Sequence, residues 1–146
     1  MDEFSKKVET QFIEEFPEWE NFCSTETNED EVVFSAKVPN PSGDEAHPLS
    51  VDTFRGEVTV AFDAYHAHFY DFIDPEDDDA LSFIKKLISG DCAVVSYWRG
   101  DQWCGSILLP ANEFPTTNEE YPCASTIRFR SWTGKYNNEI SCIPKD

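Results

Sequence analysis

Apolar residues at the start of the chain recur with the spacing of an α-helix. The positions on one face of such a helix are all apolar: Phe4, Val8, Phe12, Ile13 and Phe16. The acidic residues of the same segment fall outside this stripe, and Pro17 follows it directly. Because proline interrupts a helix, the pattern predicts an amphipathic helix that ends at Pro17.

After this helix the apolar pattern changes to that of β-strands. A strand is expected over residues 32–38, and it ends at Pro39, where a loop rich in turn-forming residues begins. Two further strands are expected over residues 49–54 and 57–65. Apolar and polar residues alternate in the last of these strands, which indicates one buried and one exposed face.

Six of the nine residues in the segment 71–79 are acidic. An EF-hand calcium loop needs alternating oxygen ligands, a central glycine and a distal bidentate glutamate, and this segment lacks that pattern. A helix start is favoured instead, with Asp74 as the cap, Pro75 at the first helical position and the later acids near the positive end of the helix dipole. A helical apolar stripe follows: Ala80, Leu81, Ile84, Leu87 and Ile88.

The last third of the chain is rich in β-forming residues. Strands expected over residues 92–98 and 102–109 flank Gly100-Asp101, which predicts a β-hairpin with a tight turn. Two more strands are expected over residues 124–132 and near residues 139–143. The order of helices and strands predicts an α+β fold.

The whole chain of 146 residues has the length of one domain, so a single domain over residues 1–146 is expected. In this fold a largely antiparallel sheet packs against the N-terminal helix and one central helix.

The hairpin brings aromatic residues together. Its expected register places Trp98 opposite Trp103 on one face, and Tyr97 opposite Cys104 on the other. Core packing is the usual role of such residues. A tryptophan pair beside an exposed turn is also typical of a protein-binding surface, because aromatic residues anchor interfaces. The sequence leaves both roles open.

The charge of the chain is strongly negative. The 29 acidic residues outnumber the 11 basic ones, which gives a formal net charge of −18. Nucleic-acid binding and adhesion to an anionic membrane both depend on Lys and Arg, so this balance argues against both. A charged partner is therefore expected to be basic. Residues 1–50 hold 13 acidic and 3 basic residues, while residues 101–146 hold 6 and 4, so the attraction is expected in the first two thirds.

The chain shows the features of a cytoplasmic protein. Its first residues have neither the basic nor the apolar region of a secretion signal, so none is expected. No apolar run approaches the roughly 20 residues of a transmembrane helix. The 5 cysteines are odd in number, scattered and without a CxxC motif, which favours reduced thiols over disulfides.

Two histidines suggest a possible metal site. In an extended strand His66 and His68 point to the same face, as two imidazole ligands of one metal ion would. Asp71 or the distant His47 would have to complete the ligand set, because a catalytic zinc ion takes three protein ligands. The alternative, that the imidazoles form structural hydrogen bonds at a strand end, is favoured because a third ligand is not evident.

Cys104 is the most plausible nucleophile, because the adjacent Gly105 could admit a substrate close to the backbone. Nothing in the sequence brings a histidine near it, so a structural cysteine is favoured. Phosphate-binding loops, dinucleotide-binding turns and zinc-protease motifs do not occur in the sequence. We therefore expect neither enzymatic activity nor a cofactor.

One part of the chain resembles small bacterial immunity proteins of polymorphic or contact-dependent toxin systems. The likeness covers about residues 54–109 and rests on GEVTVAFDAYHAHF (56–69), the helix at 80–88, VVSYW (94–98) and WCG (103–105). The resemblance implies a non-catalytic cytoplasmic protein that binds and neutralises a cognate toxin domain, often a nuclease. It transfers no contact residues.

The leading hypothesis is therefore an inhibitor that binds a basic toxin domain through charge complementarity and aromatic anchors. The residues expected to contact this partner are Trp98, Trp103, Asp101, Asp77, Asp78 and Asp79. Two alternatives remain: a metal-dependent hydrolase centred on His66, His68 and Asp71, and a DNA mimic that fills the groove of a DNA-binding protein with carboxylates.

Overall fold

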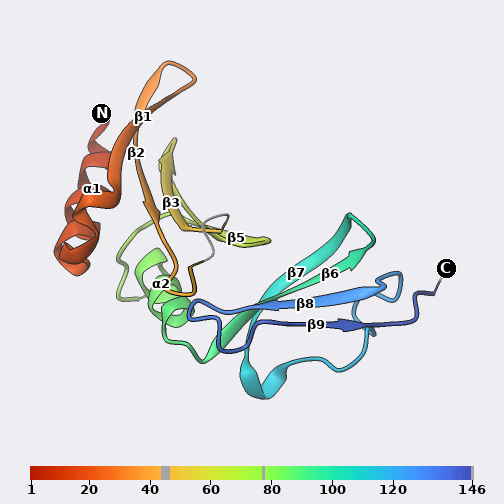
Figure 1. Cartoon of the computed structure of the whole chain (residues 1–146). Coiled ribbons are helices and arrows are strands. Elements are labelled where there is room, and N and C mark those ends of the chain that lie inside the picture. Colours follow the sequence, from red (N-terminus) through yellow and green to blue (C-terminus); the bar gives the residue numbers. More distant parts are fainter. Residues whose placement is uncertain (44–46, 77, 146) are drawn as a thin grey trace. The chain divides into compact units, whose positions relative to one another are not determined.

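The computed structural model of the chain describes residues 1–43, 47–76 and 78–145, and Figure 1 shows its helices and strands. The expected α+β class is confirmed, because an N-terminal helix and a central helix accompany antiparallel strands. The strands form two separate sheets, of five and four strands, where the sequence predicted one.

The chain divides into two compact units. Unit 1 comprises residues 1–62 and 66–85, and unit 2 comprises residues 63–65 and 86–146. The five-stranded sheet belongs to unit 1, apart from Tyr65, and the four-stranded sheet belongs to unit 2.

In the sheet of unit 1, each strand lies next to the one that follows it in the chain. The strands are β1 (Cys23–Asn28), β2 (Glu31–Val38), β3 (Leu49–Phe54), β4 (Glu57–Phe62) and β5 (Tyr65–Phe69). Two-residue turns, Glu29-Asp30 and Arg55-Gly56, connect β1 to β2 and β3 to β4. All four of these residues have positive φ, as a type I′ turn requires. An ion pair of 2.8 Å between Arg55 Nη2 and Glu29 Oε2 joins the two turns.

Strand β1 was not expected from the sequence because most of its residues are polar. It pairs with β2 along its whole length, from Cys23 opposite Ala36 to Asn28 opposite Glu31. Every residue of β1 after Cys23 is exposed. Backbone pairing at the edge of the sheet therefore holds this strand in place, and such pairing leaves no hydrophobic pattern in the sequence.

The strand predicted over residues 57–65 is divided in the structure. Asp63 has a φ of 53°, in the left-handed region, and the chain turns there between β4 and β5. Asparagine and aspartate tolerate this region better than most residues do, so the sequence permits the turn without requiring it.

Helix α1 (Glu3–Glu15) covers one face of the unit 1 sheet and contacts β2 and β3. Its N-terminus is capped by Asp2, whose carboxylate accepts a hydrogen bond from the Ser5 backbone N–H at 2.7 Å. Phe12 is fully buried. Its ring centroid lies 5.5 to 6.0 Å from those of four aromatic neighbours: Phe16, Trp19, Phe34 and Phe72. Trp19 comes from the 3₁₀ helix η1 (Pro17–Phe22), which follows α1.

Unit 2 contains the second sheet, in the order β7-β6-β8-β9. Its strands are β6 (Cys92–Arg99), β7 (Gln102–Pro110), β8 (Thr126–Arg130) and β9 (Asn138–Ser141), and β7 leads into the 3₁₀ helix η2 (Ala111–Glu113). Helix α2 (Ala80–Ile88) begins in unit 1 and ends in unit 2.

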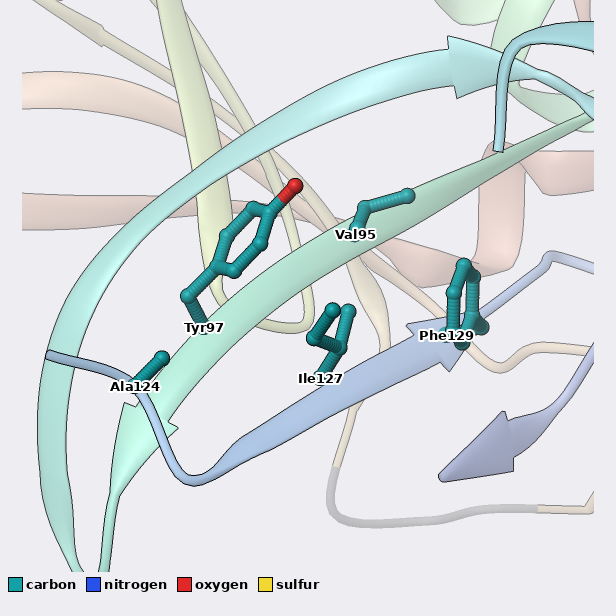
Figure 2. Packing of buried hydrophobic residues seen from close by; sticks show 5 residues of the cluster. All are labelled: Val95, Tyr97, Ala124, Ile127 and Phe129. Atoms are coloured by element: carbon teal, nitrogen blue, oxygen red, sulfur yellow. The ribbon is translucent and has the colours of Figure 1, made fainter. Parts of the chain in front are cut away.

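One face of the unit 2 sheet carries a core of buried side chains. Figure 2 shows its members: Val95, Tyr97, Ala124, Ile127 and Phe129. The partly buried Phe114 and Tyr121, from the segment between β7 and β8, pack against this core. This long connection therefore covers the sheet and contributes to the surface described below.

Replacing Phe12 by alanine is expected to lower the free energy of unfolding by about 3–5 kcal/mol, because the substitution leaves a cavity among four rings. Urea unfolding followed by circular dichroism measures this loss. Phe22 is 39% exposed and serves as the matched control, so Phe22→Ala is expected to have a much smaller effect. Equal losses in the two variants would contradict this description of the core.

Candidate functional site

The tryptophans of the β6–β7 hairpin have different surroundings. The expected pairing of Trp98 with Trp103 is confirmed. Trp98 is half-buried, its Nε1–H donates to Ser96 Oγ at 2.8 Å, and the Arg128 guanidinium lies over its ring at 4.9 Å. Trp103 is 57% exposed and Asp101 is exposed in the turn. Trp103 is thus the member of the pair that offers a large apolar surface to a partner.

The predicted pairing of Tyr97 with Cys104 is wrong. A β-bulge between Tyr97 and Trp98 shifts the register, so that Tyr97 lies opposite Gly105 and Cys104 is the extra residue of β7. A bulge changes which residues share a face, and the alternation of residue types does not reveal it.

The space beside Gly105 is occupied by Tyr121. A Cβ atom on Gly105 would approach Cζ of Tyr121 to 2.2 Å, which is far too close for any side chain. The sequence suggested that this glycine could admit a substrate, but it accommodates a tyrosine ring of the same unit. The Tyr121 ring also contacts that of Tyr97, with centroids 4.8 Å apart.

Cys104 lies beside another cysteine. Its Sγ atom is 3.6 Å from Sγ of Cys123, which is exposed. Burial raises the pKa of the Cys104 thiol, and the hydrogen bond and charge of Cys123 act in the same direction. A raised pKa keeps the thiol protonated at neutral pH, whereas a nucleophile must be a thiolate. These surroundings favour the structural interpretation of Cys104.

Asp79, one of the residues expected to contact a partner, is 5% exposed. Its Oδ1 accepts a hydrogen bond from the Ser82 backbone N–H, and its Oδ2 accepts one from the Asp74 backbone N–H, both at 2.7 Å. Asp79 is therefore the cap of α2, which begins at Ala80. The predicted cap, Asp74, instead accepts a hydrogen bond from the Glu76 N–H within the preceding turn.

Two other acidic residues of this segment, Asp77 and Asp78, were also expected to contact a partner. Asp78 is exposed. Asp77, which the sequence also assigned to the partner surface, lies outside the described residues. Of the six predicted contact residues, Trp103, Asp101 and Asp78 are thus exposed. Asp79 is buried, and both of its carboxylate oxygens accept the hydrogen bonds of the helix cap.

His66 and His68 lie on the same face of β5, as their spacing predicted, with ring centroids 5.1 Å apart. His68 Nδ1 is 2.8 Å from Thr59 Oγ1 on β4 and 4.0 Å from a carboxylate oxygen of Glu57. Within the described ranges, no group of three His, Cys, Asp or Glu residues is arranged to hold a metal ion. Asp71 therefore does not complete a ligand set, and the contact with Thr59 agrees with a structural role for His68.

The charge of the chain is concentrated in unit 1. This unit has 21 acidic and 5 basic residues, a net charge of −16, while unit 2 has 8 acidic and 6 basic residues, a net charge of −2. The exposed tryptophan and the negative charge therefore belong to different units.

A base-free acidic segment, residues 8–36, accounts for much of this charge. It has nine acidic residues and no Lys, Arg or His, and it runs from α1 through η1 and β1 into β2. In the described chain, two of the nine form ion pairs, Glu15 with Lys85 at 3.8 Å and Glu29 with Arg55. This 29-residue stretch without a base can be read from the sequence, although the acidic residues are packed more densely in residues 71–79.

The field of this segment acts on Cys23 in β1. Burial raises the pKa of the Cys23 thiol to about 11, and the carboxylates of Glu9 and Glu20 act in the same direction. Nearby negative charge disfavours the thiolate, so Glu9 and Glu20 add to the larger effect of burial on this thiol.

Comparison with protein-family models, curated proteins and solved structures found no match to the chain. None of the helices in the described part of the chain has the length and apolar character of a membrane-spanning segment.

Replacing Asp79 by asparagine is expected to make stability less dependent on pH. Burial alone would raise the pKa of this carboxyl, but the hydrogen bonds from Ser82 and Asp74 outweigh it and lower the pKa from 3.8. A lowered pKa stabilises the folded state above the ordinary pKa, and this contribution is lost as the pH falls through the folded-state value. Asparagine keeps one acceptor oxygen but cannot accept both N–H groups.

We expect Asp79→Asn to lose about 1 kcal/mol at neutral pH and to approach the parent protein below about pH 4. Urea unfolding at a series of pH values measures this difference. Glu76→Gln removes an exposed carboxylate of the same segment and is expected to show no comparable change. A difference for Asp79→Asn that is constant down to pH 2 would show that its charge has no part in the cap.

Proposed function

We propose that this protein is a non-catalytic inhibitor that binds a cationic protein domain, and that it acts in the cytoplasm as the immunity protein of a basic toxin domain. The observation that carries the proposal is the net charge of −16 on unit 1, which the cations of that unit do not offset. The resemblance of residues 54–109 to immunity proteins supports the same choice of partner.

The acidic surface is suited to accelerating encounter with such a partner. Clustered charge of one sign attracts a partner of the opposite sign and raises the association rate, in favourable cases by roughly 10- to 1000-fold. In the base-free acidic segment, residues such as Glu18, Glu20 and Glu26 are exposed, and the described chain places no cation within ion-pair distance of them. Their charge is therefore available to a partner.

Trp103 is suited to slowing dissociation. Hot spots of protein interfaces are enriched in tryptophan, and a large exposed aromatic side chain gains most from being buried against a partner. Trp103 lies on the nearly neutral unit 2, where its neighbour Trp98 is covered by Arg128. In this proposal the negative unit mainly sets the association rate and the aromatic anchor mainly sets the dissociation rate.

The association rate with a basic toxin domain encoded next to this protein is expected to fall roughly tenfold or more between about 0.02 M and 0.5 M NaCl, because salt screens the attraction. Stopped-flow mixing measures this rate. An association rate that does not change over this range of NaCl concentration would show that charge attraction does not speed binding. Equal binding to many unrelated DNA-binding proteins would indicate the DNA-mimic alternative instead.

Replacing Trp103 by alanine is expected to raise the dissociation rate by roughly tenfold or more and to leave the association rate nearly unchanged. Tyr70 is 77% exposed and belongs to unit 1, so Tyr70→Ala serves as the matched aromatic control. Surface-based kinetics measure both rates. Loss of affinity in the control that equals the loss in Trp103→Ala would contradict a specific anchor.

A further inference from the structure

Unit 2 contains a pocket of about 540 Å³ beside strands β6 and β7. This volume falls within the range of pockets that hold small organic groups. The segment between β7 and β8 forms the opposite wall. Its lining includes Tyr97, Ile107, Leu109, Glu113, Glu120 and Tyr121.

Tyr97 is one of the residues that line this pocket, and it is 1% exposed. Figure 2 shows the ring on the core face of the sheet, with the hydroxyl oxygen at the end that points away from Ala124. A tyrosine hydroxyl can donate and accept a hydrogen bond, so Tyr97 offers one polar contact to a group bound in the pocket.

The pocket favours a positive charge on that group. Glu113, Glu119 and Glu120 all line it, and they are three of the eight acidic residues of unit 2. All three are exposed, and no Lys or Arg of the described chain forms an ion pair with them. Burial raises the pKa of Tyr97, with Glu120 and Tyr121 acting in the same direction, so its hydroxyl remains neutral and can accept a hydrogen bond.

Aromatic and aliphatic walls favour an organic cation over a metal ion. Tyr121 is fixed between Gly105 and the ring of Tyr97, and aromatic faces attract ammonium and guanidinium groups. Ile107 and Leu109 line the pocket as well and offer contact to an alkyl chain. A bare calcium ion would require six to eight oxygen ligands, which such walls do not supply.

We propose that this pocket binds an alkylammonium or guanidinium group, presented as a lysine or arginine side chain of the partner protein. The N–H groups of the cation donate to the Tyr97 hydroxyl and to the glutamates, while its alkyl stem packs on Ile107 and Leu109. The inference rests on the proposed function for the source of the cation, because a basic partner presents such side chains. In this proposal unit 2, although nearly neutral overall, binds a basic side chain through the glutamates of its pocket.

The first test is a nuclear magnetic resonance titration of the full chain with N-acetyl-arginine-methylamide and the corresponding lysine compound. Saturable shifts are expected for Tyr97, Gly105 and Tyr121. The citrulline compound has the shape of the arginine compound but no charge, and it is expected to bind at least roughly threefold more weakly. Absence of saturable shifts, or equal binding of the citrulline compound, would overturn the inference.

Substitutions in the pocket test whether the arginine compound binds there. Tyr97→Phe removes only the hydroxyl, Glu120→Gln removes only a charge, and Gly105→Ala displaces Tyr121. Each is expected to weaken binding of the arginine compound roughly two- to fivefold. Asp91→Asn removes an exposed charge of unit 2 outside the pocket and is expected to change nothing. Equal binding by Tyr97→Phe, Glu120→Gln and the parent protein would contradict the assignment, whether or not Gly105→Ala folds.

The same variants separate this inference from the proposed function. If the toxin domain binds the parent protein but the arginine compound does not, the inference fails and the proposed function stands. If the arginine compound binds but no toxin domain does, the pocket is a site for a free organic cation and the proposed function fails. A partner side chain is supported when Tyr97→Phe and Glu120→Gln weaken both complexes.

Discussion

Unit 1 has to hold 21 acidic residues close together with only 5 basic residues to offset them. Repulsion among like charges opposes a compact state, so apolar burial must supply the stability. The ring cluster around Phe12 joins α1 and η1 to the sheet, and the ion pair between Arg55 and Glu29 joins two of its turns. Exposed ion pairs contribute little, so the aromatic core is the larger stabilising factor.

Because the excess of negative charge opposes folding, we expect it to serve binding and not stability. In the proposed function that role is the attraction of a cationic domain by the base-free acidic segment. Unit 2 then contributes short-range contacts, through Trp103 and through the pocket around Tyr97. The two units differ in net charge by 14, so they differ in what they can do at long range.

Local patterns predicted the parts of the fold that depend on neighbouring residues in the chain. The helical stripe around Phe12 and the hairpin at Gly100-Asp101 were both anticipated because their signals are complete within a few residues. The start of α2 was misplaced because Asp74 and Asp79 are both good caps. In the structure Asp79 caps the helix, because its carboxylate accepts hydrogen bonds from two backbone N–H groups, including that of Asp74.

Other features arise from contacts between distant residues and could not be predicted. The glycine opposite Tyr97 is explained by Tyr121, which lies 16 positions beyond Gly105 in the chain. The same long-range packing assembles the pocket and brings Glu120 toward Tyr97. Strand β1 was missed for a different reason, because its pairing with the next strand at the sheet edge leaves no apolar signal.

The central claim is that carboxylates of unit 1 speed the encounter with a cationic partner. Its most direct test is the association rate constant, at low salt, of a variant in which Glu18, Glu20 and Glu26 are all replaced by glutamine. The account predicts an association several times slower than that of the parent protein, with no loss of folding stability. An unchanged association rate constant in a correctly folded variant would contradict it.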